Sequence, residues 1–470
     1  SLLAPLAYGG WRELYVNILE KNRPTIAIEN PPPGLGNKPI TIQFDVADTE
    51  SGLDEVIVRS SQEGELNELF RKRYDVKTTN DRIQLTLEPN PKKFYPGQVE
   101  IMISAYDRSY WSNGRRTSLM LRVDYDVPTI KVLTQQHNGV IGGAQLSFYQ
   151  VEEGGDALSG VTVGGYLFPG FQAKNLDRGF EARPDIYFSF FAIPFEFDDA
   201  DDKIKVFARD AVGNVAYDSM YYRVRNRSYG TATVTIPDEY AELELPKLVD
   251  SYYALDAAIN LNPRKTASPP QSSEEQIAQL QMVVNDYQGL IETSLQPLFA
   301  RPKLRRPWTG AFRRPSVSAV RGDFGEQVTM MVAGKAAASY RRSGVDFAAP
   351  EGSEVRAAQA GWVIFSDTLG PYGTTVILDH GFGLYTLYAH LSEASVVEGD
   401  ELRPSDLLGR SGSSGFALRP TLRFEVRLHG VPVRPAEWWD ARWVDEHIES
   451  RIERMKRLSG IPTSLSLDPL

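Results

Sequence analysis

Short stretches in which apolar and polar residues alternate dominate the first half of the chain. Clear examples are I-T-I-Q-F-D-V at 40–46, A-Q-L-S-F-Y-Q-V at 144–151 and K-I-K-V-F-A-R at 203–209. Gly, Asn and Asp cluster between these stretches, and alternation with a period of two between turn residues is typical of β-strands in a sandwich. We therefore expect this half of the chain to be built from β-sheets.

The strand pattern repeats at a spacing of about a hundred residues. The stretch P-T-I-A-I at 24–28 is echoed by P-T-I-K-V at 128–132, and V-E-I-M-I-S-A-Y-D at 99–107 is echoed by K-I-K-V-F-A-R-D at 203–210. The ending A-x-D-x-x-G-N-x-A of the second copy resembles bacterial immunoglobulin-like modules.

This repeat predicts two tandem immunoglobulin-like β-sandwich domains, over residues 23–125 and 126–226. They follow a lead-in at 1–22, in which the stretch 11–19 fits a helix or a strand equally well. An acidic run at 196–202 has the hard oxygen ligands that calcium prefers. We favour a solvated hairpin turn for this run, because it lacks the glycine-punctuated aspartate loop of a calcium site.

A possible strand T-A-T-V-T-I at 231–236 precedes a change to helical spacing, and we predict residues 227–319 to be a linker with helices. Ser272 followed by Glu275 forms a capping-box pattern, which marks the start of a helix. Apolar residues recur on one stripe of the following stretch, 275–298. We expect this stripe to pack within the chain; a partner protein is the alternative.

Short strands return over residues 320–437, and helical spacing with alternating charges returns over 438–470. The predicted fold class is therefore mainly β and multidomain. Two sandwich domains come first, then the partly helical linker, and last a β-rich domain that ends in a helix and tail.

A series of motifs in the C-terminal domain resembles the zinc endopeptidases of the LytM/lysostaphin type, which cut peptidoglycan cross-bridges. The series runs R-S-G-V-D-F-A-A-P-E-G at 342–352, V-I-L-D-H-G at 376–381, L-Y-A-H-L-S at 387–392, R-P-T-L-R-F-E-V at 419–426 and V-P-V-R-P at 431–435. The resemblance covers roughly a quarter of the chain. It implies a β-rich domain with a groove that held zinc in the ancestral enzyme.

The family uses one zinc with three protein ligands and an open position for water. Two ligands come from an H-x-x-x-D segment and the third from the second His of H-x-H, while a Y-x-H-L histidine assists catalysis. Carried onto this chain, Asp346 survives, but Arg342 and Arg423 replace the two histidine ligands. Thr421 replaces the first His of H-x-H, and His390 is the surviving Y-x-H-L histidine.

These replacements remove the metal ligands. A guanidinium group has no lone pair for a metal and stays protonated in proteins. Two of them would repel Zn²⁺ and would neutralise Asp346. We predict that Arg342, Arg423 or both form an ion pair with Asp346, that no zinc is bound and that no residue is catalytic. The candidate binding residues of this degenerate groove are Arg342, Asp346, His390, Thr421 and Arg423.

Composition narrows the class of partner. The 470 residues carry a formal net charge of −10, which argues against nucleic acid as the ligand. The chain has no Cys, so disulfides and thiolate zinc sites are excluded. No apolar run is long enough to span a membrane. Residues 1–10 fit the end of an export or anchor segment, as well as an ordinary terminus.

The resemblance implies a non-catalytic protein of the periplasm or cell envelope. Zinc-ligand-depleted relatives, the EnvC- and NlpD-type proteins, activate cell-wall amidases by direct binding. The expected partner is therefore peptidoglycan, a cell-wall hydrolase or another envelope protein. This chain has immunoglobulin-like repeats where those relatives have a coiled coil or a LysM module. The alternatives are an active peptidoglycan metallo-endopeptidase with unusual metal ligands, and a structural scaffold or adhesin-like protein.

Overall fold

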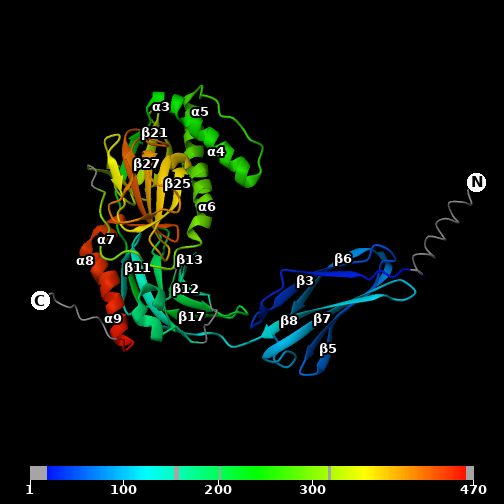
Figure 1. Cartoon of the computed structure of the whole chain (residues 1–470). Coiled ribbons are helices and arrows are strands. Elements are labelled where there is room, and N and C mark those ends of the chain that lie inside the picture. The colour runs from blue at the N-terminus through cyan, green and yellow to red at the C-terminus, as the bar shows by residue number, and fades with distance from the viewer. Residues whose placement is uncertain (1–17, 19, 153–157, 201–202, 316–318, 462–470) are drawn as a thin grey trace, which may run out of the picture. The chain divides into compact units, whose positions relative to one another are not determined.

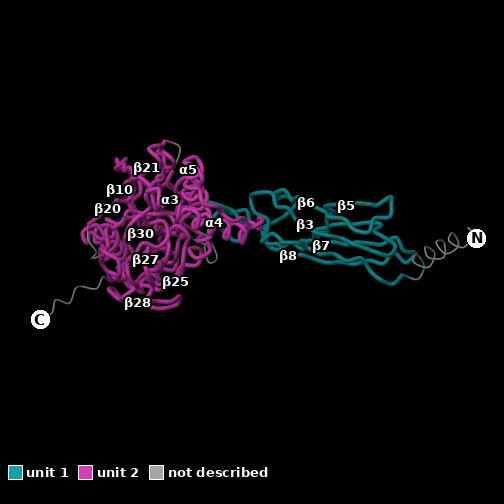
Figure 2. Tube along the Cα trace, turned by 90° about the horizontal axis from the view of Figure 1, so that it is seen from above, with its two compact units in different colours: residues 1–129, 152–158, 208–216 teal, residues 130–151, 159–207, 217–470 magenta. Residues whose placement is uncertain are grey.

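A computed structural model describes residues 18, 20–152, 158–200, 203–315 and 319–461. The chain is mainly β and multidomain, as the sequence predicts (Figure 1). It divides into two compact units, which Figure 2 shows in different colours: residues 1–129, 152–158 and 208–216 form one, and residues 130–151, 159–207 and 217–470 form the other. Most of the predicted lead-in, including all but two residues of 11–20, lies outside the described residues.

The first unit contains a sandwich of two sheets. One sheet has the order β1-β3-β6 and the other the order β2-β8-β7-β4-β5. The alternation noted at 40–46 buries Ile42, Phe44 and Val46, and these side chains share one core with Val58 and Ile101 of the other sheet. The strands are β1 (Thr25–Glu29), β2 (Gly34–Leu35), β3 (Ile40–Ala47), β4 (Leu53–Gln62), β5 (Glu65–Thr78), β6 (Asn80–Leu87), β7 (Gly97–Asp107) and β8 (Gly114–Val123).

The second repeat forms two sheets as well, each of four strands, with the orders β14-β15-β11-β9 and β13-β12-β16-β17. In addition, β10 pairs with β18. Two short helical turns, α2 (Ala173–Leu176) and η1 (Arg178–Ala182), interrupt the strand pattern. The strands are β9 (Thr129–Val132), β10 (His137–Val140), β11 (Ala144–Glu152), β12 (Leu158–Val163), β13 (Tyr166–Pro169), β14 (Phe171–Gln172), β15 (Ile186–Ala192), β16 (Ile204–Arg209), β17 (Val215–Ser219) and β18 (Tyr222–Arg225).

The segment predicted to be a helical linker begins with a strand, β19 (Thr231–Thr235), which pairs in parallel with β21 (Gln327–Val332). β21 in turn pairs with β22 (Lys335–Arg341). Helices follow β19: α3 (Asp238–Leu243), α4 (Leu245–Asn260), α5 (Ser273–Gln281), the π-helical turn η2 (Met282–Tyr287) and α6 (Gln288–Phe299).

Ser272 caps the start of α5 as predicted, and the return contact of the capping box goes to Gln271, one residue before the cap. The Ser272 hydroxyl accepts a hydrogen bond from the Glu275 N–H (3.2 Å), and the Glu275 carboxylate accepts one from the Gln271 N–H (2.6 Å). The apolar stripe packs within the chain, as expected: Leu280 and Val283 join the core of the β19-β21-β22 sheet. No helix among the described residues is long and apolar enough to cross a membrane.

The C-terminal domain is built on a ten-stranded sheet whose main path runs β20-β23-β30-β27-β26-β25-β28. Its strands are β20 (Val320–Gly322), β23 (Val345–Ala348), β24 (Glu354–Arg356), β25 (Gly361–Thr368), β26 (Thr374–Asp379), β27 (Leu384–Ala394), β28 (Glu401–Leu402), β29 (Leu407–Ser411), β30 (Thr421–Leu428) and β31 (Val431–Val433), with the turn η3 (Gly370–Tyr372). The predicted C-terminal helix is a series: α7 (Pro435–Trp439), α8 (Ala441–Val444), η4 (Asp445–Glu449) and α9 (Ser450–Leu458).

Candidate functional site

Three neighbouring strands of the ten-stranded sheet bring the predicted groove residues together. Asp346 lies on β23, Arg423 on β30 and His390 on β27. Asp346 is the direct cross-strand neighbour of Arg423, which is also opposite Ala389 on its other side. Cross-strand neighbours have their side chains on the same face of a sheet. The register therefore places Asp346 and Arg423 on one face of the sheet, and His390, the residue after Ala389, lines the same cavity.

Two guanidinium groups hold the Asp346 carboxylate. Oδ1 accepts a hydrogen bond from Nε of Arg423 (2.8 Å), and Oδ2 accepts one from Nη2 of the same residue (3.1 Å). Oδ2 also accepts a hydrogen bond from Nη1 of Arg342, which is four residues earlier in the chain. All three side chains are largely buried, with exposed fractions of 7–14%. The predicted ion pair is confirmed for both arginines.

Arg342 is positioned by its surroundings on two further sides. Its Nε forms an ion pair with Glu326 (3.4 Å). Its guanidinium lies directly over Gly322 of β20, where the Cβ of any other residue would come within 2.3 Å of the guanidinium carbon. The lack of a side chain at position 322 therefore makes room for the arginine next to Asp346.

The residues at the family's three ligand positions do not fit a zinc ion. Both oxygens of Asp346 are engaged by arginine N–H donors, and the other two positions are the arginines themselves. A guanidinium group offers no lone pair to a metal. Two guanidinium charges beside the carboxylate also raise the electrostatic energy of any added cation.

His390 is buried and neutral. Burial lowers its pKa to about 3, and the charges of Arg423 and Arg342 contribute. Its Nδ1 lies 2.9 Å from the carbonyl oxygen of Ser414, which can only accept, so Nδ1 carries the proton. The residue also has a left-handed backbone conformation, with a φ of 64°. A histidine with this pKa is not a cationic ligand at neutral pH.

Tyr340 belongs to the site although the sequence analysis did not single it out. Burial raises the pKa of its hydroxyl, but the charges of Arg423 and Arg342 outweigh burial and hold that pKa below its ordinary value. Tyr340 lies on β22 two residues before Arg342. Residues two apart in an extended chain face the same side. That spacing is the signal that could have identified it.

Arg321 and Arg419 extend the positive charge of the groove and were also missed. Nη1 of Arg321 donates to Oγ1 of Thr421 (2.9 Å) and to the carbonyl of Pro420 (3.0 Å). Burial lowers the pKa of Arg321, and the charge of Arg419 lowers it further. Arg419 is exposed and forms no ion pair with any described residue. Arg321 lies outside the family motifs, and Arg419 opens the motif at 419–426 without being one of the family's ligand positions, so the sequence alone did not indicate either residue.

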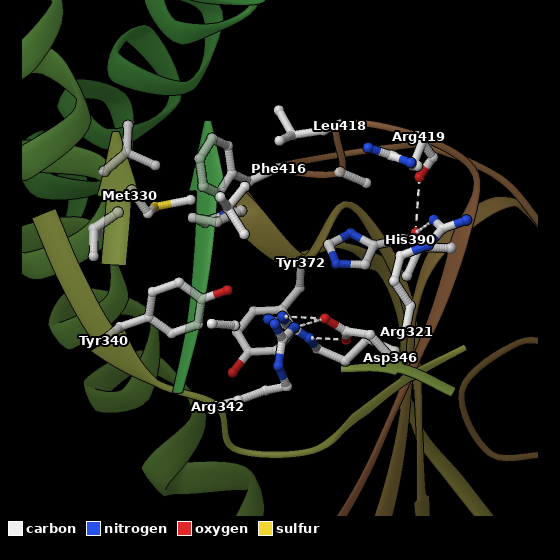
Figure 3. A pocket seen from close by; sticks show the side chains of 18 of the residues that line it. Arg321, Met330, Tyr340, Arg342, Asp346, Tyr372, His390, Phe416, Leu418 and Arg419 are labelled. Atoms are coloured by element: carbon white, nitrogen blue, oxygen red, sulfur yellow. Dashed lines mark hydrogen bonds and ion pairs between the residues drawn. The ribbon is translucent and has the colours of Figure 1, made fainter. Parts of the chain in front are cut away.

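These residues line a cavity of about 460 Å³. Figure 3 shows Asp346, His390 and Arg321 on one side of it, with Met330 and Phe416 on the other. The predicted linker forms part of the wall: β19, Val283 and Val284 of η2, and Gln288 of α6 all contribute. The groove is therefore built jointly by the C-terminal sheet and the helical segment before it.

The helical wall is attached to the sheet by polar contacts. Nη1 and Nη2 of Arg427, a fully buried residue of β30, donate to the carboxylate of Glu292 on α6 (2.6 and 2.9 Å). Gln288 donates to the hydroxyl of Tyr372 (3.0 Å), which also accepts from Arg427 (3.1 Å).

The other four histidines do not line this cavity. His380 is bonded to Ala360 and Thr386, and His137 to Thr134 and Arg451. His429 stacks on Phe171, and His447 bonds to the Trp443 carbonyl. Among the described residues, the groups of acidic and histidine side chains that could hold a metal do not include Asp346.

Comparisons with known proteins point to the same part of the chain. The model of peptidase family M23 matches residues 340–435. A segment of 93 residues is 43% identical to the DD-carboxypeptidase/endopeptidase Mpg of Neisseria meningitidis, covering 20% of this chain and 21% of that protein. A segment of 98 residues is 40% identical to the murein hydrolase activator EnvC of Escherichia coli, covering 21% of this chain and 23% of that protein.

Among solved structures, a putative M23 peptidase from Pseudomonas aeruginosa matches 64% of this chain and 95% of its own, with 19% identity and a TM-score of 0.38. The chain thus spans about a fifth of the length of the curated relatives above. The family match does not reach residues 23–226, so the immunoglobulin-like assignment stays a prediction, as do the domain boundaries. Residues 340–435 of this chain, which hold most of the groove, are a domain of peptidase family M23, the LytM/lysostaphin type.

Proposed function

We propose that this chain is a non-catalytic protein of the bacterial cell envelope whose M23 domain binds a ligand in the groove and regulates hydrolysis of the cell wall. The double ion pair on Asp346 carries the proposal. Arg342 and Arg423 occupy both oxygens of Asp346, the one carboxylate among the described residues that line the groove. The site therefore has the shape of a peptidase groove and the donors of an anion-binding site.

The relatives support a regulatory role of this kind. One is named as a murein hydrolase activator and another as a carboxypeptidase/endopeptidase. The donor set at positions 342, 346 and 423 favours the first kind of protein. We expect the protein to act in the periplasm or elsewhere in the envelope, where its partner would be peptidoglycan, a hydrolase or another envelope protein.

The chemistry of the groove suggests which group of the ligand is recognised. Four arginines line it (Arg321, Arg342, Arg419 and Arg423), against the carboxylates of Asp346 and the neighbouring Glu326. Positive charge is thus in local excess in a chain whose net charge is −10. Arginine recognises carboxylates with paired hydrogen bonds. We infer that the ligand presents a carboxylate to Arg419, as a peptidoglycan stem peptide or an acidic partner surface would.

The test compares two charge reversals at exposed arginines, Arg419→Glu in the groove and Arg403→Glu outside it. The full chain, purified without chelator, is assayed for pelleting with peptidoglycan and for its effect on release of dye from labelled sacculi, alone and with an amidase. We expect no release by the protein alone and an effect on the amidase. We also expect R419E to reduce binding at least about tenfold and R403E to leave it unchanged.

Two outcomes would support the alternatives. Dye release by the protein alone that a chelator abolishes would show a metallo-endopeptidase and would overturn the proposal. If R419E and R403E bind and activate equally, the groove is not the binding site and the protein is better described as a scaffold.

A further inference from the structure

Three carboxylates meet at one end of the first sandwich. They belong to Glu20, before β1, to Asp48, in the turn between β3 and β4, and to Asp107, at the end of β7. Each offers an oxygen atom that lies within 4.8 Å of the others. The strand register explains the meeting, because Thr25 is opposite Ala47 and Leu53 is opposite Asp107.

The three carboxylates are buried without a basic partner. Their residues are 4%, 5% and 1% exposed, in the order Glu20, Asp48 and Asp107. No ion pair among the described residues involves any of them. Several negative charges that are withdrawn from water and close together are strongly unfavourable unless a cation compensates them.

Hydrogen bonds orient the aspartates and leave oxygens available. Oδ1 of Asp48 accepts from the N–H groups of Glu50 (3.1 Å) and Gly52 (2.8 Å), and no hydrogen bond of a described residue reaches its Oδ2. Oδ1 of Asp107 accepts from Ser109 and Asn113, and its Oδ2 accepts from the Asn113 amide (2.9 Å). Both aspartates are therefore fixed in place before any ligand arrives.

A second observation, separate from the aspartates, also indicates a missing ligand. Oε1 of Glu20 and Oγ of Ser51 are buried, and neither makes a hydrogen bond of normal geometry. Ser51 is 4% exposed, and its N–H donates to Oε2 of Glu20 (3.2 Å). Buried polar atoms are normally satisfied, and two together need a partner.

We propose that Glu20, Asp48 and Asp107, with Ser51 beside them, form a calcium-binding site at this end of the first sandwich. All the donors are oxygens, which suit a hard cation. Ca²⁺–oxygen distances of about 2.4 Å allow two ligand atoms to lie up to about 4.8 Å apart, and the three carboxylates meet that limit. Calcium tolerates irregular coordination by several carboxylates, whereas Mg²⁺ demands a near-ideal octahedron.

The second repeat has acidic residues at the sequence positions that correspond to Glu20, Asp48 and Asp107 of the first. Loops that are simply exposed to solvent would not need acidic residues at the same positions. Asp124 precedes Pro128 by four residues as Glu20 precedes Pro24, and Asp210 matches Asp107. The third match, Asp156, lies outside the described residues, so the proposal is confined to the first repeat. The Asn214 amide donates to Asp210 and to the Asp124 carbonyl, just as that of Asn113 donates to Asp107 and the Glu20 carbonyl.

Calcium would tie the chain that enters the sandwich to the sandwich itself. Glu20 lies ahead of the first strand, whereas the two aspartates belong to the ends of sheet strands. Trp111, in the turn after β7, donates from its indole to the carbonyl of Ile18, two residues before Glu20 (2.8 Å). This tryptophan can therefore report on the site.

The test is a titration of the full chain with Tb³⁺, excited through tryptophan, followed by displacement with CaCl₂ or MgCl₂. We expect sensitised emission that Trp111→Phe abolishes and that Ca²⁺ displaces at about 0.1–1 mM, the range of extracellular calcium modules. Glu20→Gln and Asp48→Asn should each weaken binding about tenfold or more. Asp75→Asn, which changes an exposed carboxylate of the same sandwich, should bind as the unaltered chain does.

Three results would overturn the proposal: no sensitised emission from the unaltered chain, emission that E20Q and D48N both leave unchanged, or displacement by Mg²⁺ as readily as by Ca²⁺. Circular dichroism of E20Q guards against a folding artefact. Glu20 precedes the first strand and is not part of the shared core, so a native spectrum with lost binding supports the site.

Discussion

At the scale of single residues, the groove surrounds Asp346 with the positive charge that a metal centre would supply. Arg342 and Arg423 together carry two positive charges, the same formal charge as Zn²⁺, and both are directed at Asp346. Their donors satisfy the carboxylate with the geometry that guanidinium groups favour. Each of these three buried charges therefore has a partner of opposite sign.

Restoring the two ligands tests whether the rest of the site still has the shape for zinc. We expect the double variant R342H/R423H to bind about one equivalent of zinc through the two new imidazoles and Asp346. Elemental analysis after dialysis gives the zinc content of the variant and of the unaltered chain. We expect no zinc in the unaltered chain. Zinc in the unaltered chain at equal stoichiometry would contradict our account of the groove.

Removing the shared carboxylate should cost more than removing a surface charge. Asp346→Asn leaves two largely buried guanidinium groups facing each other, so we expect the free energy of unfolding to fall by about 3 to 5 kcal/mol. Asp367→Asn, at an exposed position of β25, is the control and should change it by less than about 0.5 kcal/mol. Urea unfolding followed by tryptophan fluorescence measures both. Equal effects would show that the ion pairs contribute little.

At the scale of elements, the sequence predicts the helix after Ser272 but not its role. The capping box and the apolar stripe are local signals, and both predictions are confirmed. The sequence does not show that η2 and α6 form a wall of the groove. This role depends on contacts of α6 with Tyr372 and Arg427, which are more than 80 residues away in the chain. The place of Arg321 in the groove likewise depends on a distant residue, Thr421. The pairing of Asp346 with Arg423 could be predicted from the motif, because a buried arginine needs a carboxylate.

The contact between α6 and β30 offers a way to loosen this wall. Glu292→Gln removes one partner of the fully buried Arg427, which keeps Glu425 (2.7 Å). Since the Glu292 side chain is 33% exposed, we expect the free energy of unfolding to fall by only about 2 kcal/mol. Glu242→Gln on α3, which is exposed, is the matched control. Faster hydrogen exchange over 288–299 in E292Q alone would confirm the anchor, and unchanged exchange would contradict it.

At the scale of the whole molecule, charge is distributed unevenly. The chain is acidic overall, yet the groove is lined by arginines. Buried titratable groups add a dependence on pH. Glu437 on α7 accepts a hydrogen bond from the Ala144 N–H of β11 (2.9 Å), and burial raises its pKa to about 7. This contact joins the C-terminal helices to the second repeat.

The raised pKa of Glu437 predicts that stability falls as the pH rises. The folded protein binds this proton more tightly than the unfolded chain does, so the stabilisation is complete below about pH 4.5 and is lost as the pH passes about 7. Glu437→Gln stays neutral, and we expect it to be more stable than the unaltered chain at pH 8 by up to about 3 kcal/mol. At pH 5 the two should be similar.

Thermal unfolding at pH 5, 6, 7 and 8 measures the difference. Glu398→Gln, at an exposed position, is the control and should follow the unaltered chain throughout. A constant difference between E437Q and the unaltered chain over this range would show that Glu437 does not titrate as described.

The pairing of β19 with β21 has a consequence for how the groove can open. The helices follow β19, and the chain then passes through β20, which pairs with β23 in the ten-stranded sheet, before it reaches β21. If a partner pulls the helices from the groove, β19 before them and β21 after them still hold both ends of this segment. Re-docking is then intramolecular, with a high effective concentration and a modest entropic cost of loop closure. The groove wall would behave as a tethered flap that resets itself once the partner leaves.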